Sequence, residues 1–246
     1  MNSSLQSSFT ILATVGLLQA QEGPCLPHFR GEVSYSEGRL EHRSGEAYFD
    51  GKADASFGRI QLEGFADMGL GGGLKLHRSE SLDDLAAPAG PGDVEAERSS
   101  WFLHASYLLL DSRFRLPIRL GWLHHDLELR HRLSGDTATC ECAGIQLELE
   151  PELLLVAEGR FQCSLFGNFG LARTKATSEV HGIDFLSGDV HSHAWFGGFE
   201  VGSRISWNHC GIGMSYLWQR QSIEDGVIDD SEVDFEGILF TVGVVF

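Results

Sequence analysis

The sequence predicts an all-β fold: an antiparallel, up-and-down transmembrane β-barrel of ten strands, with eight strands as the alternative. Three observations support this prediction. Apolar and polar residues alternate along many segments, short and long connections follow one another, and an alternating apolar segment ends the chain at Phe246. Successive side chains of a strand point to opposite faces, so such alternation indicates strands with one apolar and one polar face.

The composition agrees with β structure and argues against two other classes of protein. The 246 residues include 30 glycines and 10% aromatic residues, which favours strands and turns over helices. They include 35 acidic but only 18 basic residues, so we expect no nucleic-acid partner, because binding phosphates requires clusters of Lys and Arg. No run of about 18 or more apolar residues occurs, which excludes a helical membrane span.

An apolar run near the start predicts export. Residues 9–18 (FTILATVGLL) have the length of a signal-peptide core, and Ala20 in the following Gln19-Ala20-Gln21 suits a cleavage site. We therefore expect a signal peptide at residues 1–20 and one barrel domain at residues 21–246. Residues 1–8 contain no Lys or Arg, which a secretory signal normally has, and a short buried or disordered segment is the alternative.

Residues 144–155 (GIQLELEPELLL) show the alternation most clearly. Ile145, Leu147, Leu149, Leu153 and Leu155 share one face, and the residues on the other face are mainly glutamates. An amphipathic helix would instead need apolar residues at spacings of three and four. Comparable alternation occurs in residues 46–57, 59–70, 161–174, 195–207 and 211–221.

The connections alternate between short and long, as is typical of membrane barrels with tight turns on one side and longer loops on the other. We expect tight turns near 56–58, 111–113, 157–160 and 208–211, and longer polar loops at 78–98, 132–141, 179–192 and 224–232. The strands between them are predicted at 29–40, 45–56, 58–77, 99–110, 113–130, 143–156, 160–177, 193–208, 211–223 and 233–246.

The C-terminal strand carries a signature of its own. Ile238, Phe240, Val242, Val244 and Phe246 lie on one face of the predicted strand. This segment resembles the β-signal of Gram-negative outer-membrane β-barrel proteins, which the barrel-assembly machinery reads, although it assigns no specific family. The resemblance implies an exported protein of the bacterial outer membrane. It implies outer-membrane lipid and the barrel-assembly machinery as partners, and it leaves a small solute open.

A soluble secreted β-barrel that binds an apolar ligand is one alternative, because periodicity alone does not say which face is inside. In such a protein Trp195, Phe199, Trp207, Tyr216 and Trp218 would form a very aromatic core. In a membrane barrel such residues form girdles at the two interfaces, a position that suits Trp101, Trp122, Trp195, Trp207 and Trp218. We therefore favour the membrane barrel.

In a membrane barrel the charged face of each strand lines the interior. For the predicted strand at 45–56 this rule places Lys52 and Asp54 inside the barrel. Three successive glutamates on one strand are consistent with a narrow, cation-preferring pore, whereas paired charges would form a plug with a structural or surface role. Because a ten-stranded barrel is narrow, we expect ion pairs between strands. They would form a lumen cluster of Arg115, Arg119, Glu148, Glu150, Glu152, Glu200 and Arg204.

A barrel enzyme with a His/Asp site at the extracellular rim is a further alternative. The candidate rim residues are His124, His125, Asp126, His191 and His193, whose side chains can act as general bases or metal ligands. Their spacing matches no protease motif, and the sequence has no nucleophile elbow, P-loop, dinucleotide fingerprint or zinc-protease helix. We expect no catalytic residue, no metal and no cofactor.

The cysteines do not indicate a disulfide framework. Their number is odd, so at least one stays unpaired, and the spacing of Cys140-Glu-Cys142 is too short for a usual zinc knuckle. Cys163 falls on the apolar face and is expected to contact lipid. The other two are Cys25 and Cys210.

Overall fold

The structure, a computed structural model, describes residues 29–43, 51–81, 94–111, 113–131, 135–158, 160–181, 190–224 and 231–246. The predicted signal peptide at residues 1–20 lies outside these ranges. Within them there is no helix long and apolar enough to cross a membrane. The strands are β1 (Phe29–Arg43), β2 (Gly51–Phe65), β3 (Leu70–Ser81), β4 (Val94–Leu110), β5 (Phe114–His131), β6 (Thr137–Leu149), β7 (Glu152–Glu158), β8 (Phe161–His181), β9 (Val190–Trp207), β10 (Cys210–Glu224) and β11 (Ser231–Val245).

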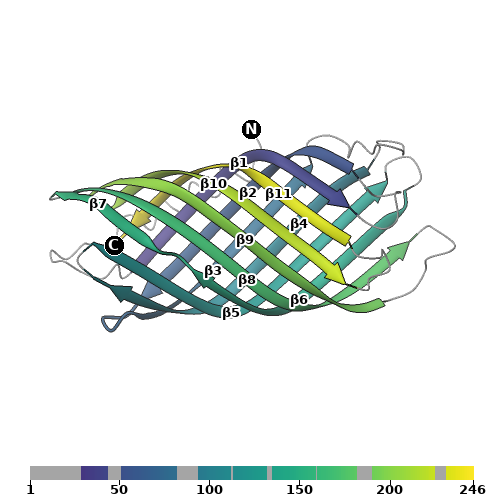
Figure 1. Ribbon diagram of the computed structural model, residues 1–246, viewed down its shortest axis with the longest axis horizontal. Coiled ribbons are helices and arrows are strands. Elements are labelled where there is room, and N and C mark those ends of the chain that lie inside the picture. Colours follow the sequence, from purple (N-terminus) through teal and green to yellow (C-terminus); the bar gives the residue numbers. More distant parts are fainter. Residues whose placement is uncertain are drawn as a thin grey trace.

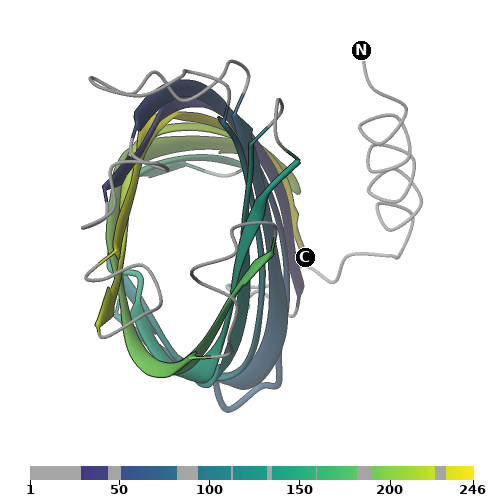
Figure 2. The same ribbon diagram turned by 90° about the vertical axis from the view of Figure 1, so that its right-hand side faces the viewer.

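The strands form one closed antiparallel barrel, tilted against its long axis (Figure 1) and ring-shaped when viewed along it (Figure 2). The first and last strands close it, since β1 pairs with β11 from Arg30↔Val245 to Arg43↔Glu232. β6 and β7 occupy one position of the sheet, because both pair with β5 on one side and β8 on the other. The barrel therefore has ten strand positions, and the predicted fold class and strand count are confirmed.

A proline separates β6 from β7. Pro151 has no N–H to donate to a neighbouring strand, which interrupts the regular ladder there. The backbone nevertheless stays bonded on both sides. The Glu150 N–H donates to the Pro117 carbonyl oxygen at 3.0 Å, and the Gly167 N–H donates to the Pro151 carbonyl oxygen at 2.9 Å. The chain thus continues in the wall of the barrel, and Glu150 stays buried in the interior.

Two glycines face each other where the barrel closes. Gly38 of β1 pairs with Gly237 of β11. A Cβ atom on Gly38 would overlap the backbone of Glu236 and Gly237, and one on Gly237 would overlap the Ser36 hydroxyl. The close approach of β1 and β11 therefore depends on the absence of side chains at this pair.

The outer face of the barrel has two zones, which β5 shows along one strand. Phe114, Leu116, Ile118, Leu120 and Trp122 point outwards on the side of the short turns, and Leu120 is 56% exposed. Beyond Trp122 the outward residues become polar, namely His124, Asp126, Glu128 and Arg130. We call the apolar zone the outer belt. An exposed apolar band of this kind fits lipid and is the reverse of a soluble barrel, which buries its apolar face.

Tryptophans mark the loop-side edge of the outer belt, and polar rings or cations cover three of them. The His124 ring stacks on Trp101 with centroids 5.4 Å apart. The Arg173 guanidinium lies 5.4 Å from the Trp195 ring centroid, and that of Arg220 lies 5.5 Å from Trp218. Trp207 lies at the opposite end of the strands, beside the turn that follows β9. This is the girdle arrangement that the sequence predicted.

The predicted interior position of Lys52 and Asp54 is wrong. Both are exposed on the outside, whereas Ala53, Ala55 and Phe57 between and after them are buried in the barrel. The reason is that this half of β2 lies beyond the outer belt, where water surrounds the barrel. Charged residues there are solvated outside, and the apolar residues fill the interior.

The predicted tight turn at 56–58 is also wrong. Gly58 lies inside β2, paired with Tyr35 and Arg78. The actual turn between β2 and β3 is formed by residues 66–69, where Gly69 has a φ of +78° that glycine readily adopts. Within β2 the lumen-facing residues change from apolar to charged at Arg59, so the same face changes character without a turn.

The outer belt makes a testable prediction about lipid contact. Leu120→Arg places a charge against lipid and is expected to destabilise the folded barrel by roughly 2–4 kcal/mol in phospholipid vesicles. Glu128→Arg, on the same strand and face but beyond the belt, is the matched control and should have little effect. Urea unfolding followed by the gel mobility of unboiled samples measures both. Equal stability of the two variants would contradict the assignment of the belt to lipid.

Candidate functional site

The short-turn half of the lumen is crossed by buried ion pairs that centre on Arg119 of β5. Its Nε and Nη2 atoms donate to the two carboxylate oxygens of Glu63, each at 2.8 Å. Its Nη1 atom donates to Glu148 at 2.8 Å and to Glu150 at 2.9 Å. The Arg119 side chain is fully buried. One guanidinium thus joins β2, β5 and the end of β6, with all its carboxylate partners inside the barrel.

Further ion pairs extend this group around the lumen. Glu150 also binds Arg30 of β1 at 2.6 Å, and Arg204 of β9 contacts Glu32 at 3.0 Å and Glu152 at 3.4 Å. Arg59 of β2 binds Glu200 of β9 at 2.5 Å, a contact that spans the lumen. The other members are Lys75, which binds Glu148, and Arg115, which lies 3.8 Å from Glu152.

We call this group the ion-pair layer, and its charges balance. The cations are Arg30, Arg59, Lys75, Arg115, Arg119 and Arg204, and the carboxylates are Glu32, Glu63, Glu148, Glu150, Glu152 and Glu200, six of each. Hydroxyl groups add hydrogen bonds to two of these carboxylates, since Ser164 donates to Glu152 and Ser215 donates to Glu200, both at 2.6 Å. A buried charge without a partner is very costly, so this balance allows the charges to remain inside.

All seven residues of the predicted lumen cluster lie in the ion-pair layer. Glu200 and Arg204, four residues apart on β9, face the same side, but their partners are on other strands. Sequence reasoning did not include Arg30, Glu32, Arg59, Glu63 and Lys75 in the cluster. Lys75 could have been predicted from the alternation in β3. Residues two apart share a face, so Lys75 lies on the same face as Gly73 and His77.

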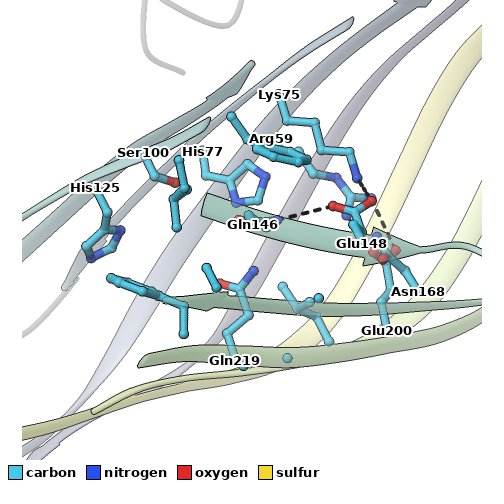
Figure 3. A pocket seen from close by; sticks show the side chains of 18 of the residues that line it. Arg59, Lys75, His77, Ser100, His125, Gln146, Glu148, Asn168, Glu200 and Gln219 are labelled. Carbon is cyan, nitrogen blue, oxygen red and sulfur yellow. Dashed lines mark hydrogen bonds and ion pairs between the residues drawn. The ribbon is translucent and has the colours of Figure 1, made fainter. Parts of the chain in front are cut away.

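A central cavity lies next to the ion-pair layer, on its loop side (Figure 3). On β6, Glu148 belongs to the layer and Gln146 lines the cavity. His77, His125 and Gln219 surround the space in Figure 3, with the Arg59, Lys75, Glu148 and Glu200 side chains on one side of it. The space between these side chains, with the solvent that is open to it, contains about 850 Å³ not filled by atoms.

Beyond the cavity, towards the loops, apolar side chains fill the lumen. Leu127 and Leu129 continue the inner face of β5, and they pack in one cluster with Leu40, Phe235 and Leu239 of the closing strands. We call this cluster the apolar layer. Along the axis, the lumen therefore contains charged, then mixed, then apolar side chains. The cavity lies between two filled layers.

The apolar layer includes two neighbouring thiols. Cys140 and Cys142 point inwards from β6 with their Sγ atoms 3.5 Å apart, and both are free. The Gln221 amide donates to the Cys142 sulfur at 3.7 Å. Cys163 pairs with Ile205 across β8 and β9 and follows the phase of the outward residues, as the sequence predicted.

The predicted rim residues do not form one site. His124 and Asp126 lie on the outer surface, whereas His125 between them is buried in the lumen and lines the central cavity. His193 lies on β9, which is separated from β5 by β6 and β8. His191 pairs with Thr177 in the backbone ladder, and its side chain lies outside the described residues.

One outer group has ligands of the type that metals prefer. The His124 Nε2 atom lies 3.3 Å from an Asp126 oxygen, and its Nδ1 atom lies 3.8 Å from a Glu141 oxygen. One ligand atom from each residue falls within 4.8 Å of the others. The Asp126 and Glu141 side chains are 51% and 67% exposed, and solvated carboxylates commonly meet in this way without an ion. We therefore assign no metal to this group.

Comparison with known proteins supports the fold. No protein-family model matches the chain, and no curated protein matches it either. Among solved structures, the outer membrane protease OmpT from Escherichia coli is similar over 93% of this chain and 99% of its own, with a TM-score of 0.54 and 11% sequence identity. The translocator domain of the autotransporter NalP from Neisseria meningitidis is 11% identical, with 99% and 96% covered and a TM-score of 0.48.

A third similar structure is Neisserial surface protein A, at 11% identity with 89% of this chain and 97% of that chain covered and a TM-score of 0.41. At these identities the likeness concerns the fold alone. The fold is that of outer-membrane β-barrels, in agreement with the resemblance of the C-terminal strand.

The ion-pair layer predicts a large effect of one buried cation. Arg119→Met leaves Glu63, Glu148 and Glu150 without their shared partner and is expected to cost about 3–5 kcal/mol of unfolding free energy. Urea unfolding in phospholipid vesicles measures this loss. Arg130→Met is the matched control, because the Arg130 side chain is 60% exposed and lies 4.0 Å from a Glu128 oxygen. The double variant Arg119→Met with Glu63→Gln should recover part of the loss, and wild-type stability of Arg119→Met would contradict the analysis.

Proposed function

We propose that this chain spans a bacterial outer membrane as a closed barrel with a structural or surface-exposed role, and that it is not a diffusion pore. One observation carries the proposal: the charge-balanced ion-pair layer joins strands on opposite sides of the lumen. Because each carboxylate of the layer already contacts a cation, the layer binds the barrel together and leaves no acidic wall to attract permeating ions.

The outer surface supports the membrane location. The outer belt runs around the short-turn half of the barrel, with Leu147, Phe169, Val201, Phe240 and Leu120 all more than one third exposed. All described strands except the 7-residue β7 exceed the 9–11 residues that a membrane-crossing strand needs, and β8 reaches 21. They therefore extend beyond the lipid on the loop side, where the barrel would present its surface to the outside.

Two partners belong to the proposal. Outer-membrane lipid would contact the outer belt and the tryptophans at its edge. The barrel-assembly machinery would read β11, whose outward residues Ile238, Phe240 and Val242 form an uninterrupted apolar row next to the C-terminus.

The three glutamates that suggested a cation-preferring pore have specific partners. Glu148 binds Lys75 and Arg119, Glu150 binds Arg30 and Arg119, and Glu152 contacts Arg204 and accepts from Ser164. A row of glutamates whose charges are neutralised by cations does not produce the negative potential that a cation pathway requires.

Planar-bilayer conductance tests the closed barrel. The wild-type protein is expected to give no stepwise channel currents. The double variant Lys75→Ala with Glu148→Ala shortens two side chains of the ion-pair layer while keeping its charge balance, and it is expected to give measurable steps. Glu41→Ala with Lys52→Ala is the matched control, because it removes an ion pair of 2.8 Å on the outside of the barrel. Regular, cation-selective steps from the wild-type protein would overturn the proposal in favour of a small pore.

A further inference from the structure

Four cations line the central cavity, Arg59, Lys75, Arg98 and Arg220, and three of them have an ion-pair partner, which for Arg220 is Asp234. Lys75 binds Glu148 and Arg59 binds Glu200, which accounts for both carboxylates that line the cavity from the lumen. Arg98 of β4 also lines the cavity. Within the part of the chain that the structure describes, no carboxylate forms an ion pair with Arg98.

Arg98 is buried and has free hydrogen-bond donors. Its exposure is 8%, and its Nε and Nη1 atoms have no hydrogen-bond partner among the described residues. Its neighbours in the sheet are Ser79 on β3 and Leu127 on β5, neither of which carries charge. Burial of a guanidinium in this state is unfavourable unless an anion completes the site.

Two histidines extend the polar side of the cavity. The Nε2 atoms of His77 and His125 are buried and lack partners among the described residues. Both residues occupy positions opposite Ser100 of β4, so they flank the strand that carries Arg98. Their side chains border the cavity in Figure 3. A carboxylate bound by Arg98 would thus find additional ring N–H donors nearby.

The apolar part of the cavity wall consists of aromatic rings. Phe57, Phe102 and Phe196 line it, and the first and third contact the histidines edge-on, with centroid distances of 5.5 Å for Phe57–His77 and 4.6 Å for Phe196–His125. A site with one charged group and an aromatic wall suits an occupant with one charged end and a compact apolar body.

We propose that the central cavity binds a small organic monocarboxylate, with its carboxylate on Arg98 and its apolar body against the phenylalanine rings. One unpaired cation matches one negative charge, and the aromatic wall distinguishes such a ligand from an inorganic anion. The proposal goes beyond the surface role proposed above and does not require it, because the cavity would bind the same ligand whether or not the barrel conducts.

Isothermal titration of the refolded full-length barrel in detergent with benzoate tests the proposal. Benzoate should bind saturably at one site per barrel. Benzyl alcohol, which has the same ring without the charge, and inorganic phosphate, which lacks the ring, should each bind at least tenfold more weakly. Equal binding of benzoate and benzyl alcohol would overturn the role of Arg98, and preferential binding of phosphate would overturn the role of the aromatic wall. Neither comparison needs a variant.

Arg98→Gln should reduce benzoate affinity at least tenfold, and Arg78→Gln is the matched control, because the Arg78 side chain is 62% exposed on the outside of β3. Gel mobility before and after boiling shows whether each variant is folded. The urea midpoint of ligand-free Arg98→Gln should equal or exceed that of the wild type, since an unpaired buried charge is removed. A lowered midpoint with unchanged benzoate binding would show that Arg98 is structural. Channel currents from the wild-type protein would contradict the proposal that the barrel is closed, but they would not contradict the proposal that the central cavity binds a monocarboxylate.

Discussion

Closure of the sheet between β1 and β11 is the constraint on which the rest of the structure depends. Lipid offers no hydrogen-bond partners, so a strand can cross it only when both of its edges are paired. Once the barrel is closed, the period of two divides every strand into side chains that face the lumen and side chains that face outwards. Gly38 and Gly237, opposite each other in the closing pair, allow the two terminal strands to approach closely enough.

The surroundings of the barrel change along its axis, and the side chains of the inner and outer faces change with them. On the short-turn side, lipid outside requires an apolar outer belt, and the charged residues of the strands lie inside, where six cations neutralise six carboxylates. On the loop side, water surrounds the barrel, and charges such as Asp126 and Glu128 lie outside while Leu127 and Leu129 pack inside. The chain thus combines a membrane-type barrel and a soluble-type barrel along one axis, and the central cavity lies where they meet.

This change along the axis explains what the sequence could and could not predict. For residues 144–155 the sequence predicted the inner and outer faces correctly. Glu148, Glu150 and Glu152 share one face, and charged side chains are unfavourable in lipid, so this face had to line the lumen. In β2 the apolar set moves from the inner to the outer face between Phe57 and Ile60. In a sequence, such a shift looks like the end of one strand and the start of another, and Gly58 is a residue that often occurs in turns. The sequence therefore predicted a turn at 56–58 and two strands, 45–56 and 58–77, whose boundaries are wrong.

The two buried arginines of β4 and β5 show why the site itself needed the structure. Arg119 of β5 lies beside Glu148 of β6 in the sheet, a pairing that strand register alone can suggest. Its bidentate partner Glu63, however, lies on β2, which is separated from β5 by β3 and β4. Arg98 faces the same lumen from β4, yet its sheet neighbours are Ser79 and Leu127, and no carboxylate among the described residues forms an ion pair with it. Residue type and phase are identical in the two cases. What distinguishes a cation that holds the barrel together from one that can bind a ligand is the arrangement across the lumen, and that arrangement depends on strands more than 100 residues apart in sequence, such as those of Arg59 and Glu200.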